Sequence, residues 1–96
     1  MRYGILSVPE AGQDFKRLWV RDRSTVKEAI EKHLRYEPQK IRKSRIKKLQ
    51  GMSRPQYQLR VDEIRVFCDV VEATVEVLAI ILKFKAAEWL KEEGEK

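Results

Sequence analysis

The sequence predicts a small α+β fold, in which a helical hairpin packs on one face of a mostly antiparallel four-stranded sheet and a short helix ends the chain. Apolar residues recur with the period of a helix in the first part of the chain and with the period of a strand after residue 56. Neither layer can bury its apolar side alone, so the helices must cover the sheet. The chain of 96 residues suits one domain, 1–96, with the order β-α-α-β-β-β-α.

The first half of the chain predicts one strand and two helices. Residues 2–7 suit a strand, and the first helix can begin at Ser7 or Pro9. Asp22 or Ser24 can cap the second helix, because both side chains accept hydrogen bonds from backbone amides at a helix start. Only a few residues separate the two helices, so we expect them to form an antiparallel hairpin.

The second half predicts three strands and a helix. Residues 57–61 and 64–70 both alternate with a period of two, and residues 62–63 between them suit a two-residue hairpin loop. Residues 75–82 are apolar almost throughout, which is typical of a strand in the middle of a sheet. From Lys85 onward the apolar period is that of a helix again.

Positive charge is concentrated in one segment. The net charge is +6, and residues 38–61 hold eight basic side chains and no acidic one, so this segment carries more than the whole surplus. Such a patch suits a polyanion or an acidic protein partner, and the alternative is a solvated lysine-rich loop. The basic residues are Lys40, Arg42, Lys43, Arg45, Lys47, Lys48, Arg54 and Arg60.

Several classes of protein are excluded by the composition. The longest apolar run, 77–82, is far shorter than the about 20 residues of a membrane span, so no membrane contact is expected. The single cysteine, Cys68, excludes an internal disulfide, and the single histidine, His33, excludes a histidine-rich metal site. We therefore expect a cytoplasmic protein without metal or cofactor, in which Cys68, His33, Trp19 and Trp89 serve packing or an interface.

Two arginines form the first candidate site. If residues 62–63 are a two-residue turn, Arg60 pairs with Arg65, and their side chains lie about 5 Å apart on one face of the sheet. Gln58 extends the same face. We expect this face to be open, and two neighbouring guanidinium groups match the geometry of a phosphate. The alternative is a structural cluster in which a nearby acid such as Glu76 pairs with them, and the sequence leaves both interpretations open.

The most specific run of the sequence covers residues 45–52 and 57–67. It reads RIKKLQGM and then YQLRVDEIRVF, which is similar to a family pattern L-x-G … Y-x-L-R-x-x-x-x-R-V. With this run, the chain resembles the RelE/ParE superfamily of toxins from bacterial type II toxin–antitoxin systems, with the RelE-like branch favoured. The resemblance covers nearly the whole chain and implies a toxin that a cognate antitoxin keeps silent.

The resemblance also implies a set of site residues. RelE-like toxins cut messenger RNA in the ribosomal A site with the RNA 2′-hydroxyl as nucleophile, so the protein supplies a proton acceptor and cations. Arg65 matches a phosphate-stabilising arginine, whereas Gln50, Gln58, Phe84 and Leu90 replace charged or hydroxyl side chains of RelE. The candidate catalytic residues are Arg65, Lys83, Lys85 and Tyr57, and the candidate nucleic-acid-binding residues are Lys43, Arg45, Lys47, Lys48, Gln50, Arg54, Gln58 and Arg60.

Three functions remain open at this point. The first is a toxin that inhibits translation by ribosome-dependent cleavage of messenger RNA. The second is a ParE-like inhibitor of DNA gyrase without enzymatic activity, which the unmatched RelE positions favour. The third is a weakly toxic protein that mainly binds its antitoxin. All three share an antitoxin partner, whose acidic segment would dock as a helix or strand in an open groove.

Overall fold

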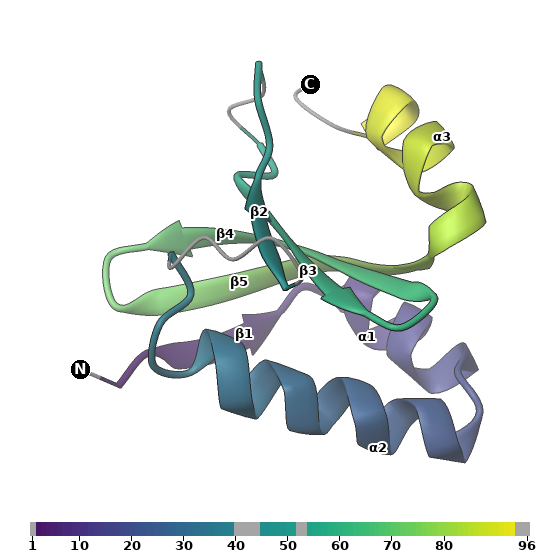
Figure 1. The fold of residues 1–96 in the computed structure, drawn as a ribbon, viewed down its shortest axis with the longest axis horizontal. Helices are drawn as coiled ribbons and strands as arrows, with labels where there is room; N and C mark the ends of the chain where they lie inside the picture. Colours follow the sequence, from purple (N-terminus) through teal and green to yellow (C-terminus); the bar gives the residue numbers. More distant parts are fainter. Residues whose placement is uncertain (1, 40–44, 52–53, 94–96) are drawn as a thin grey trace.

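The computed structural model describes residues 2–39, 45–51 and 54–93. Its elements, in chain order, are β1 (Gly4–Ser7), α1 (Pro9–Arg17), α2 (Val20–Ala29), the π-helical turn η1 (Ile30–Leu34), β2 (Ile46–Lys48), β3 (Tyr57–Val61), β4 (Ile64–Val71), β5 (Thr74–Leu82) and α3 (Lys83–Glu93). The strands form one sheet with the order β1-β5-β4-β3-β2. The helices α1 and α2 lie on one side of this sheet and α3 lies on the other (Figure 1). The predicted α+β class and helical hairpin are confirmed.

The sheet has five strands where the sequence predicted four. The additional strand, β2, lies within the basic segment and pairs antiparallel with β3, with Ile46 opposite Leu59. Ile46 is 2% exposed and packs in the core. The strand β2 has only three residues, and Ile46 is the one apolar residue among them. A single apolar residue cannot show a period of two, so the sequence did not predict this strand.

Two tight turns set the register of the central strands. Val61 pairs with Ile64 as predicted, and Asp62 in the turn has φ 51°, a left-handed conformation that Asp tolerates better than most residues. A second two-residue turn joins β4 to β5. As predicted, β5 is an interior strand, between β4 and the parallel strand β1.

The helical hairpin starts differently from the prediction at its second helix. Pro9 begins α1 as predicted, since a proline there leaves no amide hydrogen unsatisfied. The cap residue of α2 is Trp19, with no side-chain cap hydrogen bond, so neither Asp22 nor Ser24 serves as the cap. Trp19 is 75% exposed, so of the two expected roles, packing and an interface, core packing is wrong.

The two faces of the sheet bury different amounts of apolar surface. We call the side that carries α1 and α2 the helical-hairpin face and the opposite side the α3 face. The main core lies on the helical-hairpin face, and it includes Cys68, where burial raises the pKa of the thiol to about 12. The α3 face has a smaller cluster around Phe67, whose ring stacks on Trp89 with centroids 4.9 Å apart. Cys68 and Trp89 therefore pack as expected.

Candidate nucleic-acid interface

The register of the sheet brings three arginines into one row on the α3 face. Arg60 lies directly opposite Arg65, as predicted from the hairpin. The backbone amide of Arg60 donates a hydrogen bond to the carbonyl of Arg45 at 2.7 Å, so Arg45 continues the β2–β3 register opposite Arg60. Directly opposite residues present their side chains on the same face. We call Arg45, Arg60 and Arg65 the arginine row.

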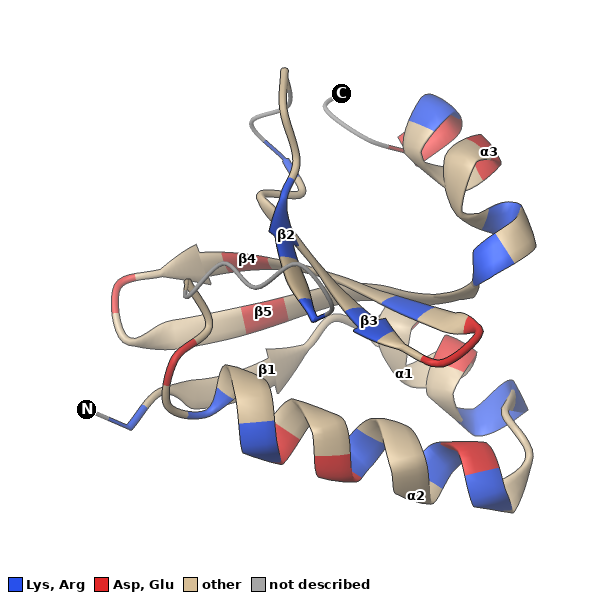
Figure 2. Ribbon diagram, in the orientation of Figure 1, with Lys and Arg blue, Asp and Glu red and all other residues tan. Residues whose placement is uncertain are grey.

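Further cations lie near the arginine row. A second cross-strand row of residues lies beside the arginine row on the α3 face. The helix α3 begins next to the turn between β3 and β4, because the backbone amide of Lys83 donates a hydrogen bond to the carbonyl of Glu63 at 2.7 Å. Figure 2 shows that basic residues of β2, β3, β4 and the start of α3 share this region of the fold. Lys83 and Lys85 are both exposed. The second row consists of Lys47, Gln58, Phe67 and Ala79.

Arg65 is not open to solvent, which corrects the predicted open pair. Its side chain is 6% exposed, and its Nη1 donates hydrogen bonds to the carbonyls of Asp62 at 2.7 Å and Ile64 at 2.9 Å. Both carbonyls belong to the β3–β4 turn, so the guanidinium fastens this turn to the strand that follows it. Arg60 is exposed. The pairing of the two arginines is confirmed, and the openness of Arg65 is wrong.

Acidic residues lie in the β3–β4 turn beside the arginine row, at Asp62 and Glu63, but they do not form ion pairs with it. In the part of the chain that the structure describes, no carboxylate forms an ion pair with Arg45, Arg60 or Arg65. The alternative in which Glu76 neutralises the pair is therefore not seen. Like charges directly opposite each other destabilise a sheet, and burial of one of them adds to the cost. An anion held over the row would relieve this repulsion.

Other candidate residues lie away from the arginine row. Tyr57 is 7% exposed in the main core, and Lys48 lies opposite Tyr57 on the same face of the sheet, so neither side chain shares the α3 face. The sequence could have predicted this, because successive strand residues point to opposite faces and Tyr57 directly precedes Gln58, which lies on the α3 face. Gln50 is exposed in the turn after β2, and Lys43 lies outside the described residues.

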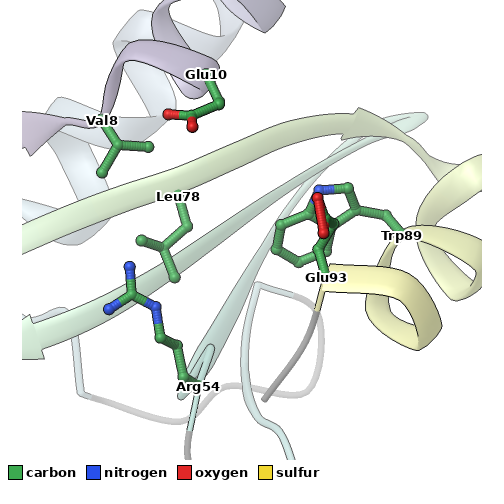
Figure 3. Close-up of a pocket in the computed structure, with 6 residues that line it drawn as sticks. All are labelled: Val8, Glu10, Arg54, Leu78, Trp89 and Glu93. Carbon is green, nitrogen blue, oxygen red and sulfur yellow. The ribbon is translucent and has the colours of Figure 1, made fainter. Parts of the chain in front are cut away.

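Arg54 belongs to a separate polar arrangement that fastens the start of β3 to β4. Its Nε lies 3.8 Å from Oδ2 of Asp69, whose Oδ1 accepts a hydrogen bond from the Gln56 amide at 2.7 Å. The Gln56 Oε1 in turn accepts from the Val70 amide at 2.9 Å. Arg54 also lines a cavity of about 230 Å³, together with Leu78 and Trp89 (Figure 3). Carboxylates of both Glu10 and Glu93 line the same cavity, so it is not purely cationic.

Asp69 makes the stability depend on pH. Burial raises the pKa of the Asp69 carboxyl above its usual 3.8, although the Gln56 amide and Arg54 act against the rise. The folded protein thus binds this proton more tightly than the unfolded chain does. The contribution of Asp69 to stability is therefore complete below the unfolded pKa and is lost as the pH rises through the folded pKa.

We expect the Asp69→Asn variant to lose this component of the pH dependence. Its free energy of unfolding, measured by urea denaturation, should decline less than that of the wild type as the pH rises from about 4 to about 7. The amide oxygen of Asn can still accept the hydrogen bond from Gln56, so the fold is retained. An identical decline in both proteins would contradict the assignment to Asp69.

Two further classes of site find no support in the described residues. Nowhere in 2–39, 45–51 and 54–93 do three His, Cys, Asp or Glu side chains come close enough to hold a metal ion. Within the same ranges, no helix has the length and apolar character needed to cross a membrane. The α3 face carries several arginine and lysine side chains, an arrangement suited to binding a polyanion.

The fold of this chain matches that of known toxins. No protein-family model and no curated protein matches the sequence. The structure is similar to a chain of the toxin–antitoxin complex RelBE2 from Mycobacterium tuberculosis, with a TM-score of 0.73 and 20% identity over 85% of this chain and 99% of that chain. It is also similar to a chain of the RelE–RelB complex from Pyrococcus horikoshii, with a TM-score of 0.70 and 21% identity over 86% and 97%.

The fold is also similar to that of a toxin whose structure was solved in the free state. The structure is similar to E. coli RelE, a double mutant in the free state, with a TM-score of 0.59 and 21% identity over 96% of this chain and 94% of that chain. The sheet, the helical hairpin and the terminal helix place the chain among small α+β proteins with a cationic sheet face. Within that class, the chain has the RelE toxin fold.

Proposed function

We propose that this protein is the toxin of a type II toxin–antitoxin pair and that it inhibits translation by cutting messenger RNA on the ribosome. The observation that carries the proposal is the arginine row, a set of cations on one face of a RelE-like sheet that forms no ion pair with any carboxylate of the described residues. Arginines in such a row suit the phosphates of a single RNA strand, and phosphate contacts fix the position of a nucleic acid on a protein.

Each part of the candidate site has a role in this proposal. The 2′-hydroxyl of the RNA attacks the adjacent phosphorus, and the 5′-oxygen of the next nucleotide leaves. Exposed Arg45 and Arg60 bind phosphate oxygens, while buried Arg65 fixes the turn and adds positive potential to the pentavalent phosphate. Lys83 and Lys85 are exposed beside the same turn. One of them, as the neutral amine, accepts the proton of the attacking 2′-hydroxyl, and the other, as the ammonium, donates a proton to the leaving 5′-oxygen.

An acidic antitoxin is the second part of the proposal. The net charge of +6 and the arginine row, which forms no ion pair with a carboxylate of the described residues, favour a partner with a negatively charged segment. The similar complex from Mycobacterium tuberculosis is a toxin–antitoxin complex, which supports the same arrangement for this chain. The antitoxin would dock a helix or a strand and cover the cations while it is bound.

Induction in a bacterial host, followed by primer extension on cellular transcripts, tests this function. We expect growth arrest together with new transcript ends that disappear when translation is blocked. Co-expression of the acidic protein encoded beside the toxin should restore growth. Intact transcripts with a DNA-damage response would favour a gyrase inhibitor instead, and undisturbed growth would favour a weakly toxic binding partner; either result would contradict the proposal.

A further inference from the structure

Phe84 is the most exposed large apolar side chain of the described residues, with 78% of its surface open to solvent. It lies in the first turn of α3, whose packing face is formed instead by Ala86, Trp89 and Leu90. The ammonium of Lys85 lies 5.7 Å from the centroid of the Phe84 ring, which is a cation–π distance. The ring therefore adds nothing to the core and stays beside a cation at the surface.

The sheet register places Phe84 close to the arginine row. Ile81 lies opposite Arg65, so the row ends on β5 three residues before Phe84. The next element starts at Lys83, whose amide bonds to the carbonyl of Glu63 in the turn beside Arg65. An exposed aromatic ring thus lies between two lysines where the cationic surface of the sheet meets α3.

We propose that Phe84 stacks on an unpaired base of the single-stranded RNA whose phosphates the arginine row binds, an inference that rests on the proposed function. Proteins hold single strands by this combination, because cations follow the backbone while an aromatic ring stacks on a base of any identity. Phe84 is thus a positioning residue that fixes one base relative to the phosphates on the row. Since every base has an aromatic face, the contact adds affinity with little sequence preference.

Trp19 provides a matched control within the same chain. It is 75% exposed, nearly as much as Phe84, so its removal takes a similar apolar surface from the protein. It precedes α2 in the connection from α1, on the side of the sheet opposite α3 (Figure 1). A loss of RNA affinity specific to Phe84 therefore reports the position of the ring rather than its hydrophobicity.

The test is fluorescence anisotropy of a labelled single-stranded RNA with the purified full chain and its variants. We expect Phe84→Ala to weaken RNA binding about tenfold, and Phe84→Tyr and Trp19→Ala to bind as the wild type does. On a strand of the same length with abasic nucleotides throughout, the wild type and Phe84→Ala should bind equally, because no base is present to stack.

The outcomes separate this inference from the function on which it rests. Equal affinity of the wild type and Phe84→Ala for RNA with bases would overturn the stacking role and leave the proposed function intact. A loss that persists on the abasic strand, or one that Trp19→Ala shares, would overturn it as well. A wild-type protein that does not bind RNA would overturn both.

Discussion

The Arg60→Glu variant is expected to be harmless when it is induced in cells. Arg60 is exposed at the centre of the arginine row, between Arg45 and Arg65. A carboxylate at this position would offset the charge of one neighbouring guanidinium group, lower the total charge of the row and repel phosphate. We expect a loss of RNA affinity of roughly ten- to a hundredfold, since hydrogen bonds to charged groups contribute about 1.5–3 kcal/mol. The fold should persist, because opposite charges across a strand pair are favourable.

The control for this variant is Arg21→Glu, which changes the net charge by the same amount. Arg21 is exposed in the first turn of α2, where an acidic residue suits the helix dipole, on the helical-hairpin side of the sheet. Growth curves after induction, with circular dichroism to check the fold, compare the two proteins. Full toxicity of Arg60→Glu would contradict the role of the arginine row. An equal loss of toxicity in Arg60→Glu and Arg21→Glu would show that net charge, and not the position of Arg60, causes the effect.

Arg65→Ala is a poor test of phosphate binding, although Arg65 is a candidate catalytic residue. The side chain is buried and bonded to the carbonyls of Asp62 and Ile64, so its removal leaves two turn acceptors without this donor. A buried acceptor that loses its partner costs about 1–3 kcal/mol. Loss of toxicity in Arg65→Ala would therefore mix a change in stability with a change in binding.

The Phe67→Ala variant is expected to lose a large part of the folding stability of the protein. Phe67 is fully buried at the centre of the cluster on the α3 face, and its ring stacks on Trp89. Truncation of a buried phenylalanine to alanine costs about 3–5 kcal/mol, which is comparable with the whole stability of many small domains. It also removes the main surface on which α3 packs. Urea denaturation measures the change.

Phe84→Ala is the control for this prediction, since it removes the same side chain from an exposed position. We expect its free energy of unfolding to stay within about 0.5 kcal/mol of the wild type. The contrast between Phe67 and Phe84 separates the packing role of one ring from the surface role of the other. A loss below about 1 kcal/mol in Phe67→Ala would show that the cluster contributes little to the fold.

The central strands could be predicted because their local signals agree with the global fold. Residues 62–63 interrupt two runs of period two, so the pairing of Arg60 with Arg65 follows from counting along the hairpin. The apolar character of residues 75–82 likewise fixed β5 inside the sheet. In both cases the deciding information lies within a few consecutive residues.

The remaining features depend on contacts between distant segments. Arg45 joins the row through pairing with β3, and neither a turn nor a period in the sequence marks that register. The burial of Arg65 depends on carbonyls that only the folded turn presents to it. Trp19 has the spacing of a helical core residue, but it lies just after the end of α1, where its side chain leaves the core.

The salt dependence of RNA affinity tests most directly whether the arginine row binds phosphates. Each phosphate contact on a single strand contributes about 0.7 to the slope of log K against the logarithm of salt concentration. We predict that Arg45→Gln and Arg60→Gln each reduce the wild-type slope by about this amount, and that Arg21→Gln leaves it unchanged. Slopes equal to that of the wild type in both row variants would contradict the role of the row.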